Sequence, residues 1–158
     1  MSVVVRPAVA ADTAVILGFV GELAAYEKLS HAVRATQADL RRDLFGPAPR
    51  VFCDIAEASG APVGTAIWYY TYSTFAGAHG LYLEDLFVAP AARGTGAGLA
   101  LMRELARRCV REKLARLEWA VLDWNTPALD FYDRLGARPP SGWLSRRLDG
   151  EALARLAV

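Results

Sequence analysis

The chain has 158 residues, 54% of them hydrophobic, and its 18 Lys and Arg residues nearly balance its 17 Asp and Glu residues, giving a formal net charge of +1. The scattered charges exclude an electrostatic case for nucleic acid or a membrane surface as partner, and no apolar stretch approaches the roughly 20 residues that span a bilayer. We therefore expect one domain over residues 1–158, located in the cytoplasm, with no nucleic-acid or membrane partner.

The N-terminal part of the chain predicts a short strand followed by two helices. Residues 3–5 are β-branched and indicate the strand. Asp12 or Thr13 can cap a helix whose apolar residues recur at helical spacing up to about Leu29. Thr36, with an acid three residues later, forms a capping box that opens a second, shorter helix.

Three stretches rich in β-branched and aromatic residues follow, at residues 51–58, 63–72 and 81–88. Short segments containing glycine or proline separate the first two and the last two. This spacing predicts three consecutive antiparallel strands joined by tight connections.

The second half of the chain alternates helix and strand. The pattern predicts a helix over residues 99–112, a strand over 116–122 and a helix opened by Asn125 or the residue after it. A last strand at 143–148 and a short helix from Glu151 complete the prediction. Antiparallel strands followed by alternating helices and strands predict an α/β fold, in which helices flank a mixed antiparallel and parallel sheet.

A glycine-rich turn, Arg-Gly-Thr-Gly-Ala-Gly at residues 93–98, lies between a predicted strand and a predicted helix. Glycines let backbone N–H groups approach an anion, and the following helix points its positive N-terminus at the same place, so the turn predicts phosphate binding. Leu99 and Ala100 follow it where a P-loop needs Lys and Ser or Thr, and Gly98 comes only two residues after Gly96, which excludes the dinucleotide fingerprint. A glycine-rich turn without a ligand is the alternative.

The remaining pattern, Arg-x-x-Gly-x-Gly after a strand, resembles the acetyl-CoA loop of the GNAT superfamily, and most of the chain resembles its diamine acetyltransferases, the spermidine/spermine and thialysine enzymes. The segments that carry this resemblance are Val5-Arg6-Pro7-Ala8, Glu22-Leu23-Ala24, Tyr26-Glu27-Lys28-Leu29, Leu81-Tyr82-Leu83-Glu84-Asp85-Leu86-Phe87-Val88, Arg93-Gly94, Asp123-Trp124-Asn125, Phe131-Tyr132, Leu135-Gly136-Ala137 and Gly142-Trp143. Residues 72–74 and 121–125 are more similar to the thialysine type.

The resemblance implies the GNAT acyl-CoA N-acyltransferase fold, acetyl-CoA as co-substrate, a homodimer, and transfer of acetyl to a primary amine of a small molecule by direct attack. It further implies that Glu84 binds or deprotonates the amine and that Tyr132 donates a proton to the CoA sulfur. The alternatives are an outward-facing strand acid for Glu84 and a core tyrosine for Tyr132.

The expected contacts with acetyl-CoA come from both halves of the chain. They are Leu86, Phe87, Val88, Arg93, Gly94, Thr95, Gly96, Ala97, Gly98, Leu99, Asn125, Ala128 and Tyr132. The N–H groups of residues 94–99 are expected to hold the pyrophosphate, with Arg93 adding charge, and a backbone N–H near Leu86 to polarise the thioester carbonyl. Asn125 resembles the residue that anchors the pantetheine arm, and it is also a good helix cap.

A cationic substrate needs carboxylates and aromatic faces near the acetyl group. The candidates are Tyr26, Glu27, Glu84, Asp85, Asp123 and Trp143, among which Glu27 and Asp123 have equal claims as surface acids. The chain has Ser73 in a region where the polyamine enzymes carry an acid, and it lacks acids just before Gly142. Fewer acids favour a smaller amine, such as an amino acid with a side-chain amine, over spermine.

Two other activities remain open from the sequence: acetylation of a protein or antibiotic amine, and non-catalytic binding of an acyl-CoA. A metal site is not expected, because Cys53, Cys109, His31 and His79 are isolated and lack metal-ligand spacing. Both cysteines are interpreted as buried thiols, outside the motifs that carry the chemistry.

Overall fold

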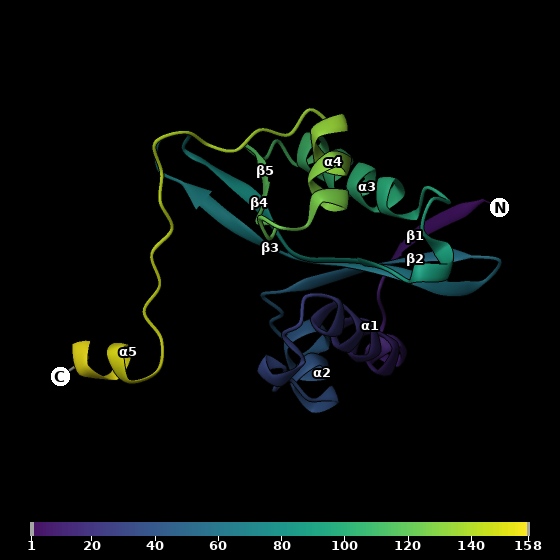
Figure 1. Ribbon diagram of the computed structural model, residues 1–158, viewed down its shortest axis with the longest axis horizontal. Helices are drawn as coiled ribbons and strands as arrows, with labels where there is room; N and C mark the ends of the chain where they lie inside the picture. Colours follow the sequence, from purple (N-terminus) through teal and green to yellow (C-terminus); the bar gives the residue numbers. More distant parts are fainter. Residues whose placement is uncertain (1, 158) are drawn as a thin grey trace. The chain divides into compact units, whose positions relative to one another are not determined.

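The computed structural model describes residues 2–157, which form two compact units, one up to Ala120 and one from Val121 onward. The first unit contains a sheet with the strand order β1-β2-β3-β4-β5 (Figure 1). Its strands are β1 (Val3–Pro7), β2 (Phe52–Ala58), β3 (Ala61–Ser73), β4 (Ala78–Val88) and β5 (Leu117–Trp119). Neighbours from β1 to β4 are antiparallel and β5 is parallel to β4, so the predicted mixed sheet is confirmed.

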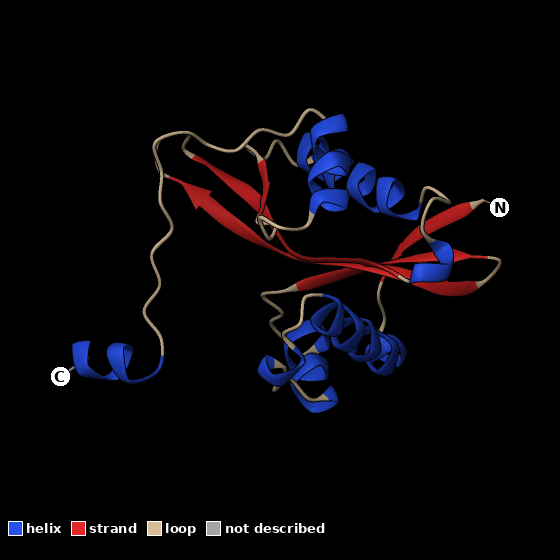
Figure 2. Ribbon diagram, in the orientation of Figure 1, coloured by secondary structure: helices blue, strands red, loops and turns tan. Residues whose placement is uncertain are grey.

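Helices cover both faces of this sheet (Figure 2). α1 (Thr13–Tyr26) and α2 (Gln37–Phe45) lie on one face, and α3 (Ala97–Arg111) lies on the other. Three short 3-10 helices connect the elements, at Ala10–Asp12, Ser30–Ala32 and Pro90–Ala92. None of the helices within residues 2–157 has the length and apolar content that a membrane crossing requires.

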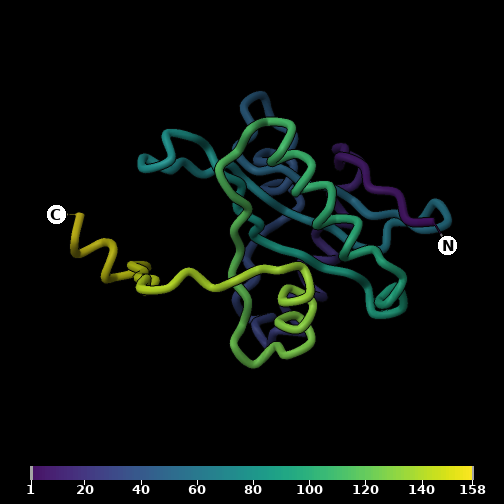
Figure 3. Tube along the Cα trace, turned by 90° about the horizontal axis from the view of Figure 1, so that it is seen from above, coloured from purple at the N-terminus to yellow at the C-terminus, as the bar shows by residue number. Residues whose placement is uncertain are grey.

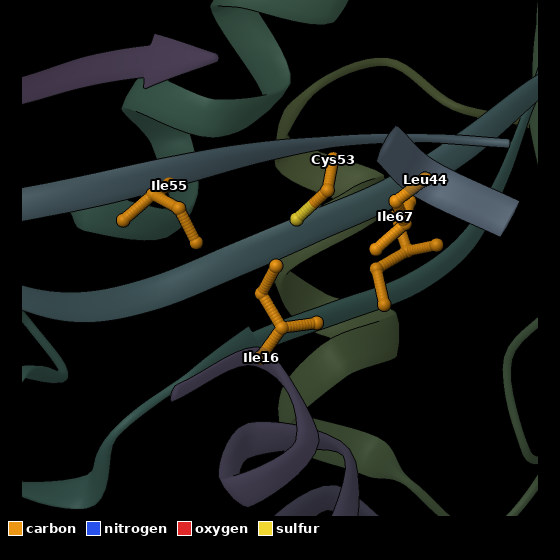
Figure 4. Packing of buried hydrophobic residues seen from close by; sticks show 5 residues of the cluster. All are labelled: Ile16, Leu44, Cys53, Ile55 and Ile67. Atoms are coloured by element: carbon orange, nitrogen blue, oxygen red, sulfur yellow. The ribbon is translucent and has the colours of Figure 1, made fainter. Parts of the chain in front are cut away.

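The core between the sheet and α1 and α2 is aliphatic (Figure 4). It is formed by Ile16, Leu44, Cys53, Ile55 and Ile67. Because successive strand residues point to opposite faces, Cys53 and Ile55 face this core and the residue between them faces α3. Burial of such side chains contributes about 1.5–3 kcal/mol each, which fixes α1 and α2 on the sheet.

Local signals set the ends of both helices on this face. The backbone N–H of Asp39 donates to Thr36 Oγ1 (3.2 Å) and the Thr36 N–H donates to Asp39 Oδ2 (3.0 Å), so the predicted capping box is present. α1 ends at Tyr26, three residues earlier than predicted, because Lys28 adopts a left-handed φ of 62°. Such a residue ends a helix by turning its backbone out of the α conformation.

A buried ion pair joins the sheet to α3. Arg108 Nη1 donates to Asp54 Oδ2 (2.7 Å), and Trp68 Nε1 donates to the same oxygen (2.9 Å). The Arg108 guanidinium also lies over the Trp68 ring, 4.3 Å from its centroid. Asp54 is only 2% exposed, so its charge depends on these donors for stabilisation.

The strands of the hairpin β3–β4 differ in their partners along their length. β2 pairs with β3 only as far as Trp68, so the second half of β3 pairs with β4 alone. The end of this hairpin projects beyond the other strands (Figure 3), and Phe75 at its tip is almost fully exposed. β5 is shorter than the predicted 116–122, because its ladder with β4 covers three residues.

The second unit contains α4 (Thr126–Arg134) and α5 (Gly150–Leu156), both as expected from the sequence. Asn125 caps α4, since its Oδ1 accepts from the Ala128 N–H (3.4 Å). The predicted strand at 143–148 is wrong: these residues have no strand partner among those described, and Trp143, Leu144 and Leu148 are exposed. The segment has no β-branched residue, and apolar side chains alone do not make a strand without a neighbouring backbone to pair with.

We predict that Arg108→Ala lowers the free energy of unfolding by about 3–5 kcal/mol, because it leaves the Asp54 carboxylate buried without its cation. Urea unfolding at neutral pH measures the change. Arg107→Ala is the matched control: its guanidinium is exposed and its ion pair with Glu104 is long, at 3.8 Å, so a change within about 0.5 kcal/mol is expected. Equal effects of the two substitutions would contradict the assignment.

Candidate active site

An extra residue interrupts the pairing of β4 with β3, directly after the point where the pairing of β4 with β5 ends. Ile67 lies opposite Asp85 and the next residue, Trp68, lies opposite Leu83, so Glu84 is inserted as a β-bulge. On its other edge β4 pairs with β5 only from Leu81 to Leu83. The β5-side edge of residues 84–88 therefore has no partner strand among the described residues, and apart from the Val88 carbonyl, which accepts from Arg93, it is open to a ligand.

The glycine-rich turn follows directly after this open edge. Gly94 and Gly96 have φ values of 77° and 92°, in the left-handed region that a Cβ disfavours. α3 begins at Ala97, earlier than predicted, and its first helical hydrogen bond runs from the Ala100 N–H to the Gly96 carbonyl. The N–H groups of residues 97–99 are thus left without helical partners at a positive helix end, which is a suitable cradle for the pyrophosphate of CoA.

Side chains near this turn brace the loop. Thr95 Oγ1 donates to the Ala92 carbonyl (2.6 Å), and Arg93 Nε donates to the Val88 carbonyl (3.2 Å). The Arg93 guanidinium also lies over the Tyr26 ring, 5.1 Å from its centroid. Tyr26, which the sequence placed among the substrate candidates, therefore contacts Arg93, the first residue of the glycine-rich turn.

Three of the candidate carboxylates come together on the face covered by α1 and α2. Asp85 lies opposite Ile67, a residue of the core on that face, and directly opposed residues share a face. Burial, with the charges of Glu84 and Glu27, raises the pKa of Asp85 to about 6, and burial raises the pKa of Glu27. Within residues 2–157 no ion pair joins any of the three to a cation, whereas Asp12, before α1, and Asp54, in β2, are held by arginines.

Two tyrosines that the sequence did not single out complete this acidic face. Tyr69 and Tyr82 are directly opposed and their rings stack, with centroids 5.3 Å apart. Burial and the charge of Glu84 raise the pKa of both phenols. Because side chains alternate between the two faces along β3, Tyr69 is expected on the same face as Ile67. Its partner across the strand pair, Tyr82, depends on the bulge, which the sequence does not predict.

The remaining substrate and cofactor candidates from the second half of the chain belong to the second unit. They are Asp123, Asn125, Ala128, Tyr132 and Trp143. Asn125 is the N-cap residue of α4, and Tyr132 lies seven residues further on, within the helix. Trp143 is 78% exposed and lies outside any strand.

Neither the two cysteines nor a metal site forms part of this group of carboxylates and tyrosines in the described residues. No group of three or more His, Cys, Asp or Glu side chains is arranged to hold a metal ion in the described part of the chain. Cys53 and Cys109 are free and buried, as predicted. Burial raises the pKa of Cys53 to about 12 and also raises that of Cys109, so neither thiol is an activated nucleophile.

The sequence model of the Acetyltransferase (GNAT) family matches residues 15–137. The chain is 40% identical to a thialysine N-epsilon-acetyltransferase of Sus scrofa, over 99% of this chain and 98% of the relative. It is 36% identical to a thialysine N-epsilon-acetyltransferase of Caenorhabditis elegans, over 90% of this chain and 89% of the relative. Among solved structures, an integron cassette protein from V. cholerae is similar, with 28% identity, coverage of 99% and 98%, and a TM-score of 0.83.

The family match includes the strands β2 to β5, the glycine-rich turn and α4, and the mixed sheet with flanking helices is the fold of that family. Family members use acetyl-CoA as co-substrate. The chain therefore belongs to the GNAT family of acetyltransferases and is an N-acetyltransferase.

Proposed function

We propose that this enzyme transfers acetyl from acetyl-CoA to the side-chain amine of a small amino acid of the thialysine or lysine type. The observation that supports this is the group of carboxylates Glu27, Glu84 and Asp85 beside the open edge of β4. None of the three forms an ion pair within residues 2–157. The names of the relatives from Sus scrofa and Caenorhabditis elegans point to the same substrate class.

In the proposed reaction, the carboxylates and the stacked tyrosines attract and hold the protonated amine. Glu84 then takes a proton from the amine, directly or through a water, which exposes the nitrogen lone pair. Acetyl-CoA supplies the activated acetyl group as a thioester. A backbone N–H near Leu86, on the open edge of β4, donates to the thioester carbonyl oxygen.

The bond from nitrogen to the acetyl carbon forms and the bond from that carbon to sulfur breaks, and Tyr132 donates the proton that the departing thiolate requires. The second proton, which the nitrogen loses as it becomes an amide, restores the Tyr132 hydroxyl. Residues 97–99 and Arg93 hold the pyrophosphate, while Phe87, Val88 and Ala128 are assigned to the pantetheine arm, which Asn125 anchors. We further propose that both compact units form one catalytic domain, since the family match spans them. We also propose a homodimer, from the family resemblance, and a cytoplasmic location, from the sequence pattern.

We predict that Glu84→Gln lowers kcat by about 10²-fold or more, because it removes the proton acceptor, and that Tyr132→Phe lowers it by a similar factor through loss of the proton donor. Release of the CoA thiol measures turnover, with thialysine, lysine, ornithine, putrescine, spermidine and spermine as acceptors. Tyr70→Phe serves as control, because the Tyr70 hydroxyl donates to Glu112 (2.6 Å) on the α3 face. Unchanged turnover in both active-site variants would refute the assigned roles. Binding of acetyl-CoA without turnover of any amine would instead favour a binding module or an acceptor outside the panel.

We predict that Gly96→Ala raises the KM for acetyl-CoA by about tenfold, because a Cβ at a φ of 92° strains the turn that presents the N–H groups. Gly60→Ala is the matched control: its φ of 77° is equally unfavourable, but it lies in the β2–β3 connection. Both variants are expected to lose stability, and only Gly96→Ala is expected to change the KM. A similar KM in the two variants would argue against the cradle.

We predict that Asp85→Asn stabilises the free protein at pH 8 by about 2–3 kcal/mol, and much less at pH 4. The folded-state pKa of Asp85, about 6, lies above its ordinary value of 3.8, so the wild type loses stability as the pH rises through this window. The asparagine variant, which has no such proton to lose, avoids this loss. Chemical unfolding at both pH values gives the difference, and a difference independent of pH would contradict the environment assigned to Asp85.

A further inference from the structure

A pocket of about 520 Å³ opens on the same face of the sheet as the carboxylates, where α2 leads into β2. It is lined by Asp43, Ala48, Arg50, Val51 and Tyr69. Three elements contribute: the last turn of α2, the connection to β2, and the middle of β3. Of the residues that line this pocket, only Tyr69 has a part in the transfer of acetyl proposed above.

The pocket contains charges of both signs. Arg50 is exposed and has no ion pair with any residue from 2 to 157. Asp43 is held by Arg42, whose Nε and Nη2 each donate to one of its oxygens at 2.8 Å, and this pairing lowers the pKa of Asp43. Asp43 therefore stays a carboxylate at neutral pH, while its exposed oxygens can accept further donors. A guanidinium and a carboxylate in one pocket match the two charges of an α-amino acid head group.

Tyr69 connects this pocket to the acidic face. Its ring forms part of the pocket wall, stacks on Tyr82, and lies within the field of Glu84. Tyr69 follows Ile67 by two residues on one face of β3, and Ile67 is opposite Asp85. A diagonal separation of this kind across a strand pair is about 7–8 Å, comparable with the length of an extended lysine side chain.

From this geometry we propose that the pocket binds the α-amino and α-carboxylate groups of the acceptor, with Arg50 on the carboxylate and Asp43 on the ammonium. The substrate's side chain then lies along Tyr69, and its terminal amine reaches Glu84 and Asp85. Arg50 is accordingly a specificity-determining residue that favours amino acids over diamines, since a diamine has no carboxylate for it. This inference rests on the proposed function for the identity of the reaction.

The test compares substrates that differ only in the carboxylate. The kcat/KM is measured for thialysine and for its decarboxylated counterpart, bis(aminoethyl) sulfide, with wild type, Arg50→Gln and Arg41→Gln. Loss of a charged hydrogen bond should lower kcat/KM for thialysine in Arg50→Gln by about tenfold or more, with no loss for the sulfide diamine. Arg41 is an exposed α2 arginine that does not line the pocket, so Arg41→Gln should change neither value. Arg50→Lys should restore part of the preference.

The inference would be overturned if wild type had equal kcat/KM for the two substrates. It would also be overturned if Arg50→Gln lowered kcat/KM equally for both. Calorimetric binding of lysine and cadaverine separates this failure from that of the proposed function. If no amine is turned over but lysine binds wild type more tightly than cadaverine, and Arg50→Gln abolishes the difference, the pocket assignment holds and the reaction assignment fails. If turnover occurs without any preference that depends on Arg50, the reaction stands and the pocket assignment falls.

Discussion

The register of β4 is the constraint on which the candidate site depends. One inserted residue, Glu84, follows directly after Leu83, the last residue of β4 that pairs with β5. The same irregularity thus brings carboxylates onto the face covered by α1 and α2 and leaves a free backbone edge that runs toward the glycine-rich turn. Because a shift of one residue moves side chains to the opposite face, the acids and the open edge could not be changed independently.

The helix caps and the run of antiparallel strands were predictable from the sequence, whereas the register between strands was not. The capping box at Thr36, the cap at Asn125 and the three antiparallel strands depend on neighbouring residues, and they are present. The strand expected at 143–148 failed because a strand needs a partner that no local pattern supplies. The acids of the site were named from the resemblance, whereas Tyr69 and Tyr82 depend on cross-strand register, and the pocket at Arg50 depends on three separate elements.

Carboxylates on the two faces of the sheet differ in whether they are paired with a cation. On the α3 face, Asp54 is buried and accepts hydrogen bonds from Arg108 and Trp68, so its charge helps to hold α3 on the sheet. On the other face, the carboxylates of Glu27, Glu84 and Asp85 lie near one another and near the phenol of Tyr69, and within residues 2–157 none of the three forms an ion pair. Such an arrangement costs stability in the free protein, and it leaves the electrostatic attraction available to an incoming cation.

The burial of both thiols also bears on how this enzyme is assayed. The proposed reaction releases one thiol per turnover, and chromogenic disulfide reagents count thiols through their thiolate form. Cys53 and Cys109 are enclosed and held protonated, so the folded protein contributes little background to such a reading. A slow rise in colour without an acceptor would then report opening of the protein, and the same reagent would follow both catalysis and unfolding.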